Sequence, residues 1–198
     1  MLDRAVVAAR PSRPMNLYHL DPLGVAVEGV ERLFRWSDRV GRALAPWALG
    51  MPPRDVAAIA RDSAIGKRIS GLTEWAKVGR AEAIAGRADA ARAVIEIAEL
   101  FHAPMGALEE LDDATLREQD DAIDLVLIAA NARVQIGRGE PVSLRAIAAL
   151  AGVLPRRMQA VATAGEIPTI GASKYRRVLG KDAGRWLGER GIPGFQPG

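Results

Sequence analysis

The sequence contains no cysteine, and this absence removes several classes of protein from consideration. A chain without thiols has no disulfide framework, no thiolate zinc site and no cysteine nucleophile. An uncharged apolar run of about 18 residues, the length that spans a membrane, is also missing. The apolar run near the N-terminus is broken by Arg10 and is too short for a secretory signal. We therefore expect a cytoplasmic protein with no membrane partner.

Catalytic and metal-binding patterns are missing as well. Glu99 and His102 have the Glu-x-x-His spacing of di-iron helical bundles, but that site needs a second such pair, and the sequence has none. A histidine at a helix end, just before Pro104, is the simpler interpretation. The sequence also lacks a Ser, His and Asp arrangement and a glycine-rich phosphate loop. We expect no enzyme, no metal and no cofactor.

Charge is distributed unevenly along the chain. Residues 1–31 carry three basic and four acidic side chains, residues 32–92 carry twelve and six, residues 93–140 three and eleven, and residues 141–198 nine and three. The basic C-terminal block suits a polyanionic partner, and the acidic block at 93–140 suits a basic protein partner. Two alternatives are that the acidic block shields basic neighbours and that all these charges lie on solvated helix faces.

Aromatic residues make up only 5% of the chain, whereas Ala, Val, Leu and Ile are frequent, which favours helices.

We expect an irregular arm at 1–22 and a helical domain at 23–137. Apolar spacing predicts helices over 24–49, 55–64, 72–85 and 89–102, with Gly66 and Gly71 as interruptions. Asp112 and Thr115 are expected to begin a long helix whose apolar part, 122–136, is a core helix or a dimer contact. Residues 137–141 are the predicted linker.

After this linker the sequence predicts two short helices joined by a tight turn. Ser143 can cap a helix with Leu144, Ile147, Ala148 and Ala151 on its inner face. Gly152 stands where a left-handed turn residue is needed. Pro155 suits the first turn of the second helix, whose Met158 and Val161 face inward. The second helix then turns outward a basic and polar face formed by Arg156, Arg157 and Gln159.

Two short strands and a last helix are predicted to follow. Residues 165–170 and 171–179 have the pattern of strands around a polar turn. The turn and the return strand hold a cluster suited to phosphate groups or a minor groove, formed by Lys174, Tyr175, Arg176 and Arg177. A helix over 182–190 would present Trp186 and Leu187 to the core.

This order of elements resembles the winged helix-turn-helix of the MerR and phage-excisionase superfamily. The residues that carry the resemblance are Gly152 in the turn, Gly165-Glu166-Ile167-Pro168 after the second helix and Trp186-Leu187 in the last helix. The resemblance is confined to the C-terminal part, 138–198. It implies a second helix in the major groove, with Arg156, Arg157 and Gln159 on base edges, and a wing along the backbone or minor groove.

The expected fold is therefore mainly α, an N-terminal helical domain followed by a small winged helix-turn-helix. The expected function is sequence-specific binding of double-stranded DNA by a transcriptional regulator of bacterial or phage type, acting as a homodimer through its helical domain. The DNA-binding set also includes Ser143 and Arg145. The alternatives are a protein-interaction module, such as an adaptor or antitoxin-like inhibitor, and a DNA-architectural role. Residues 54–69 faintly resemble a second helix-turn-helix, although short Ala-rich helix pairs imitate this pattern.

Overall fold

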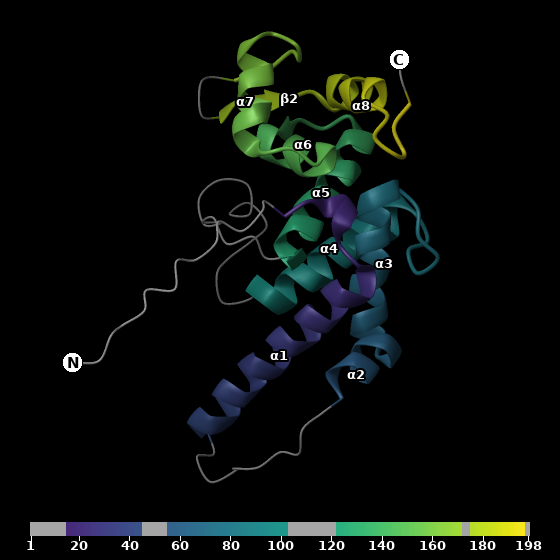
Figure 1. Ribbon diagram of the computed structural model, residues 1–198, viewed down its shortest axis with the longest axis vertical. Helices are drawn as coiled ribbons and strands as arrows, with labels where there is room; N and C mark the ends of the chain where they lie inside the picture. The colour runs from purple at the N-terminus through teal and green to yellow at the C-terminus, as the bar shows by residue number, and fades with distance from the viewer. Residues whose placement is uncertain (1–14, 45–54, 103–121, 172–174, 197–198) are drawn as a thin grey trace, which may run out of the picture.

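The computed structural model describes residues 15–44, 55–102, 122–171 and 175–196, which form a mainly helical molecule (Figure 1). The described helices are a short 3-10 turn, Leu17–His19, followed by α1 (Pro22–Leu44), α2 (Val56–Asp62), α3 (Ala64–Val78), α4 (Arg87–His102), α5 (Ala122–Arg138), α6 (Leu144–Ala151), α7 (Pro155–Thr163) and α8 (Gly180–Glu189). A small antiparallel sheet joins β1 (Val142–Ser143) to β2 (Arg177–Val178). This confirms the predicted fold class. None of the described helices has the length and apolar character needed to span a membrane.

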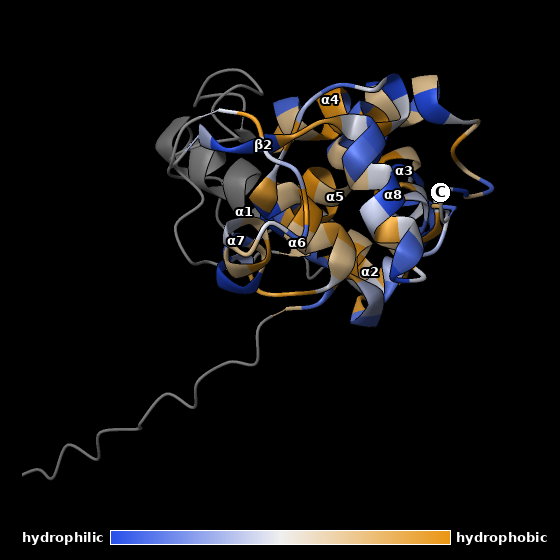
Figure 2. Cartoon of the chain, turned by 90° about the horizontal axis from the view of Figure 1, so that it is seen from above, coloured by the Kyte–Doolittle hydropathy of each residue, from blue (hydrophilic) through white to orange (hydrophobic). Residues whose placement is uncertain are grey.

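Helix α5 is the centre of the fold. It contacts α1, α3 and α4 of the helical part and also α6 and α8 of the C-terminal part. Ile123, Val126, Leu127 and Val134 are buried along it. Figure 2 shows α5 in the middle of the molecule, with the other helices around it. The sequence leaves open whether this helix is a core helix or a dimer contact. The structure supports the core helix, because the apolar residues of α5 are buried within the same chain.

The boundary between α2 and α3 differs from the prediction. We expected Gly66 and Gly71 to interrupt a helix, but α3 runs through both, and the break lies at Ser63. The Ser63 side chain accepts a hydrogen bond from the Gly66 N–H at 3.1 Å and so caps α3. A β-carbon at Gly66 would lie 1.9 Å from the carbonyl oxygen of Ala60. Glycine is required here for close packing and not for a turn, a distinction that helical spacing does not reveal.

The ends of other predicted helices also shift. The helix expected over 72–85 ends at Val78, where Gly79 adopts a left-handed φ of 77° and caps it. The helix expected over 24–49 is described as far as Leu44. The expected helix start at Asp112 and Thr115 lies outside the described residues. The apolar stripe predicted for residues 89–102 is confirmed, with Val94 and Ile97 buried in α4.

The C-terminal elements share the core of the helical part. The predicted linker, 137–141, is a compact turn in which the Glu140 N–H donates to the carbonyl of Gln135 at 2.9 Å. Val142 and Val178, paired across the two strands, are fully buried, and so are Ile147 and Leu187. These residues belong to the same continuous cluster as the buried residues of α3, α4 and α5.

The segment just before α1 is packed more tightly than an irregular arm suggests. Residues 1–14 lie outside the described residues, but Leu17 is fully buried in the 3-10 turn. The Asn16 side chain caps this turn by accepting from the Tyr18 N–H at 3.0 Å. The described part of the predicted arm therefore belongs to the folded core.

Candidate nucleic-acid interface

Helix α6 and the turn after it have the local structure that their sequence predicts. Ser143 Oγ accepts a hydrogen bond from the Ala146 N–H at 3.2 Å and caps α6. Gly152 ends the helix with a φ of 64°, and the Val153 N–H donates back to the carbonyl of Ala148 at 3.0 Å. A residue with a β-carbon is strained at this φ, so the glycine fixes the direction in which the chain enters α7.

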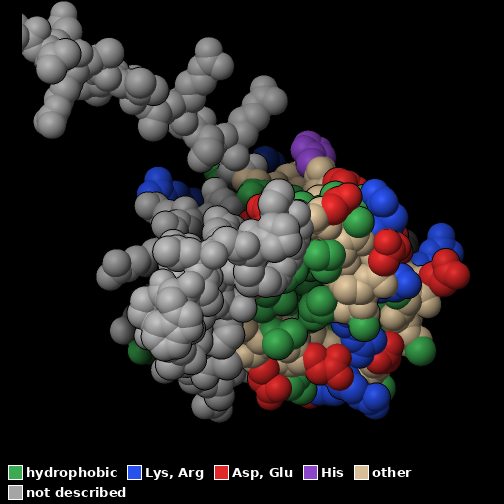
Figure 3. Space-filling view, turned by 90° about the horizontal axis from the view of Figure 1, so that it is seen from below, with side chains coloured by type: hydrophobic (Ala, Val, Ile, Leu, Met, Phe, Trp, Pro, Cys, Tyr) green, Lys and Arg blue, Asp and Glu red, His purple; other side chains and the backbone are tan. Residues whose placement is uncertain are grey.

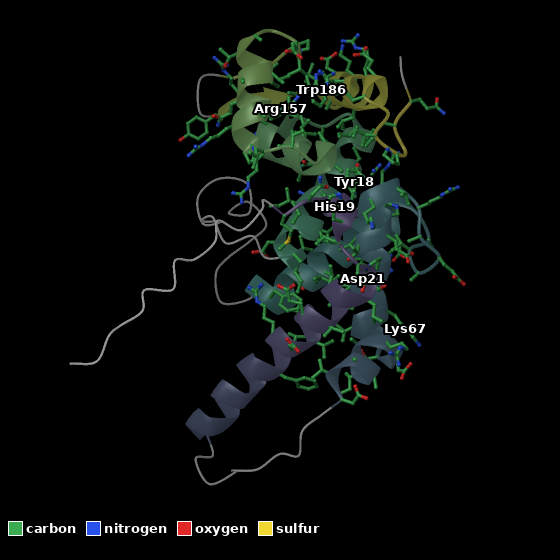
Figure 4. All side chains as sticks on the ribbon, in the orientation of Figure 1. Tyr18, His19, Asp21, Lys67, Arg157 and Trp186 are labelled. Carbon is green, nitrogen blue, oxygen red and sulfur yellow. The ribbon has the colours of Figure 1, made fainter. Side chains whose placement is uncertain are left out.

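Helix α7 buries one face and exposes the other. Pro155 occupies its first turn, as predicted, and the Met158 side chain is fully buried against α6 and the core. Arg156, Arg157 and Gln159 are exposed on the opposite side. Figure 4 labels Arg157 in the upper part of the molecule, which α6, α7 and α8 form. The predicted reading face is thus accessible along the helix.

Two of the three acidic groups of this region are engaged in ion pairs away from α7. Glu166 pairs with Arg190 at 3.1 Å, and Asp182 pairs with Arg185 at 3.1 Å. In the described part of the chain, neither Arg156 nor Arg157 forms an ion pair. Their charges therefore face solvent, where a polyanion can neutralise them.

The wing is present in a smaller form than predicted. Only Ile170 of the first expected strand pairs with Arg177, through hydrogen bonds of 2.8 and 2.9 Å. The return strand β2 pairs instead with β1, with Arg177 opposite Ser143. The side chain of Ile167 is buried and Pro168 has no N–H to donate, so this stretch does not continue the ladder.

The predicted basic residues of the wing take different positions. Tyr175 is exposed, whereas Arg176 is half-buried and its Nη1 donates to Thr163 Oγ1 of α7 at 3.3 Å. Arg177 is half-buried within β2. Lys174 lies outside the described residues. Arg145 is exposed on α6, and Ser143 uses its hydroxyl as the helix cap.

A stack of three side chains, which sequence analysis did not single out, fixes the loop between α7 and the wing. The Arg190 guanidinium lies 3.7 Å from the centroid of the Trp186 ring and also binds Glu166 in that loop. The Trp186 ring is buried, and its indole nitrogen has no hydrogen-bond partner among the described residues. The contact of an arginine with a tryptophan face is attractive, so it ties α8 to the loop.

Arg133 is a second group that sequence analysis missed. This arginine of α5 is buried, and it donates to the carbonyls of Ala76 and Lys77 at 2.7 and 2.8 Å and to that of Pro193 at 2.7 Å. Its guanidinium also lies 4.6 Å from the Phe195 ring. The only sequence signal for this role is a single cation inside an apolar helical stripe.

Two other possibilities raised by the sequence are a metal site and the second helix-turn-helix at residues 54–69. No group of His, Asp and Glu among the described residues is arranged to hold a metal ion. In the faint second helix-turn-helix, Ser63 alone separates α2 from α3, and Arg68 is bound to Asp89 and Glu96. Figure 3 shows the lower end of the molecule, where acidic and basic side chains are intermingled.

No protein-family model, curated protein or solved structure matches this chain.

Proposed function

We propose that this protein binds double-stranded DNA with α7 in the major groove and the wing against the backbone. The supporting observation is the division of α7 into two faces. Met158 is fully buried and fixes the helix, while Arg156, Arg157 and Gln159 project from the other side. A major groove is wide enough for one α-helix, and a helix held in this way presents its exposed side chains to base edges.

The chemistry of these side chains suits base recognition. Arginine donates two hydrogen bonds to the O6 and N7 of guanine, and glutamine pairs with the N6 and N7 of adenine. Arg177 of the wing lies in β2, which pairs with β1 directly before α6, and the exposed Tyr175 is two residues before Arg177. Contacts from the wing to phosphate oxygens would fix the register of α7 on the duplex without reading the sequence.

The proposed biological role is transcriptional regulation by a sequence-specific DNA-binding protein of bacterial or phage type. Two copies on two half-sites would add their contacts and fix the spacing between the half-sites. The apolar residues of α5 are occupied within the chain, so a homodimer would use another surface of the helical part.

The test is fluorescence anisotropy of the full chain on random duplex DNA over a salt series. We expect an affinity that falls steeply with salt, because each neutralised phosphate releases counterions. The variant Arg156→Ala/Arg157→Ala is expected to weaken binding and to reduce the preference for sites selected by the unmodified chain. The control Arg61→Ala/Lys67→Ala removes two exposed cations of α2 and α3 and is expected to bind as the unmodified chain does.

Two results would count against the proposal. Absence of binding at low salt would overturn it and favour a protein-interaction module. Equal losses in the α7 variant and in its control would show that net charge, and not α7, determines binding.

A further inference from the structure

Leu154 is an exposed apolar residue at the start of α7. It is the N-cap of the helix, and 51% of its surface is exposed. The N-caps of α2, α3 and α6 are Asp55, Ser63 and Ser143, and each of their side chains accepts a backbone hydrogen bond. Leu154 offers no such bond, and leucine is among the poorest N-caps. Capping therefore does not explain a leucine here, and burial explains it only in part.

The turn that leads to Leu154 is held in place from outside the helix-turn-helix. Asn16 Nδ2 donates to the carbonyl of Gly152 at 3.3 Å, and the Tyr18 hydroxyl donates to the carbonyl of Leu150 at 2.7 Å. Figure 4 places Tyr18 just below the upper part that contains α6 and α7. The segment before α1 thus fixes the backbone from which the Leu154 side chain projects.

The surroundings of Leu154 on α7 are basic. The carbonyl of Leu154 accepts from the Arg157 N–H at 3.0 Å, so both residues belong to the first turn of the helix. Arg156 and Arg157 are exposed, and α7 contains no acidic residue. An apolar side chain beside two such cations suits a polyanion that also carries an apolar group. The helix-turn-helix places the N-terminal residues of its second helix at base edges.

Thymine supplies this apolar group. Each base pair shows hydrogen-bonding groups in the major groove, and thymine alone adds a C5-methyl group. Contact between this methyl group and an aliphatic side chain removes apolar surface of both partners from water, which is favourable.

We propose that Leu154 packs against the C5-methyl group of a thymine in the major groove and is a specificity-determining residue of α7. The inference rests on the proposed function. It adds an apolar contact to the hydrogen bonds of Arg156, Arg157 and Gln159, and it states that the preferred site contains thymine at a fixed position.

Uracil in place of thymine removes only the methyl group, so it isolates this contact. Duplex sites are first selected from a random library with the full chain, and each thymine at a fixed position is then replaced by uracil in turn. We expect fluorescence anisotropy to show about a fourfold loss of affinity at one or more of these positions, the effect of burying one methyl group.

Substitutions at Leu154 connect the effect to this side chain. Leu154→Ala is expected to bind the thymine and uracil forms of the selected site equally. Leu154→Ser is expected to do the same while it supplies a polar N-cap to α7, and a thermal melt shows that each variant is folded. The control Leu100→Ala changes a leucine of α4 that is also 51% exposed, and it is expected to keep the discrimination of the unmodified chain.

Equal binding of the thymine and uracil duplexes by the unmodified chain would overturn this inference and leave the proposed function intact. A preference for thymine that persists in both Leu154 variants would overturn it too, and so would selected sites with no thymine at a fixed position. Absence of DNA binding by the unmodified chain would overturn the proposed function, and this contact with it.

Discussion

Arg133 is a cation buried in the core, where carbonyl groups take the place of carboxylates. Burial lowers its pKa to about 10, and the neighbouring Tyr18 acts in the opposite direction, so the guanidinium stays charged at neutral pH. Two of its three acceptors, Ala76 and Lys77, lie in the last turn of α3, where the helix dipole favours a positive charge. The third acceptor, Pro193, belongs to the segment after α8.

The variant Arg133→Met tests this role because it keeps most of the aliphatic packing and removes all donors. Three carbonyls lose their partner, and we expect the free energy of unfolding to fall by about 3 kcal/mol or more. Chemical denaturation followed by circular dichroism measures the change. The exposed Arg92→Ala of α4 serves as the control, with a change within about 0.5 kcal/mol. Similar values for the two variants would contradict the role of Arg133.

Asp89 gives the fold an acid-sensitive contact between α3 and α4. Arg68 holds it at 2.8 Å, and the Ala85 N–H donates to it at 2.9 Å. These two hydrogen bonds lower the pKa of Asp89 from 3.8 to about 2, and the bond from Arg68 has the larger effect. Because the folded pKa is the lower one, the folded state binds fewer protons between these values, and stability is lost as the pH falls from about 4 to 2.

We therefore expect the unmodified protein to lose more stability than Asp89→Asn does as the pH falls from about 4 to about 2, the range between the two pKa values. Asparagine still accepts a hydrogen bond but carries no charge, so its contribution does not titrate. Thermal melts at several pH values measure the difference. Identical pH profiles for the two proteins would show that the Arg68 contact contributes nothing to stability.

At the level of elements, the hydrogen bond from Arg176 to Thr163 connects the wing to the last residue of α7. It holds the wing against the end of α7, and under the proposed function this would let both contact one duplex at the same time. Thr163→Val keeps the shape and removes the acceptor, and Thr163→Ser keeps the hydroxyl. We expect about a fivefold loss of DNA affinity for the valine variant and little for the serine variant, since one hydrogen bond contributes about 1 kcal/mol.

Thermal stability separates this effect from damage to the fold. The site is exposed, so both variants are expected to melt within a few degrees of the unmodified protein, on the order of 1 kcal/mol or less. Equal affinity for the valine and serine variants would show that the wing is held by its strand pairing alone.

The features that could be predicted from the sequence are those that depend on interactions between residues close together in the chain. Ser143, Gly152 and Pro155 act through their own backbone neighbours, and their predicted roles are confirmed. Gly66 was misinterpreted because its requirement comes from Ala60, across a packed helix pair. The first strand of the wing was overestimated for a related reason, since the buried Ile167 belongs to the core and not to a ladder. The anchoring of Asn16 on Gly152 joins residues far apart in sequence, and no local pattern reveals it.

For the whole molecule, the shared core predicts a single unfolding transition. Leu127 of α5, Leu72 of α3 and Leu187 of α8 belong to one continuous cluster of buried residues. Trp75 lies in α3 and Trp186 in α8, two helices that both contact α5. We expect the variants Trp75→Phe and Trp186→Phe to give the same denaturation midpoint by tryptophan fluorescence as by circular dichroism, within error. Two separate transitions would show that the C-terminal elements fold as an independent unit.

The contact between Asn16 and Gly152 also bears on how this module can be inherited or transplanted. A β-carbon at position 152 would lie 2.9 Å from Asn16 Nδ2, so the space at the turn is shared between the two ends of the chain. A graft of residues 142–196 onto a foreign scaffold would uncover the carbonyls of Leu150 and Gly152 and the surface against Leu17. The helix-turn-helix of this protein is therefore not a free-standing cassette, and its smallest transferable unit includes the residues that precede α1.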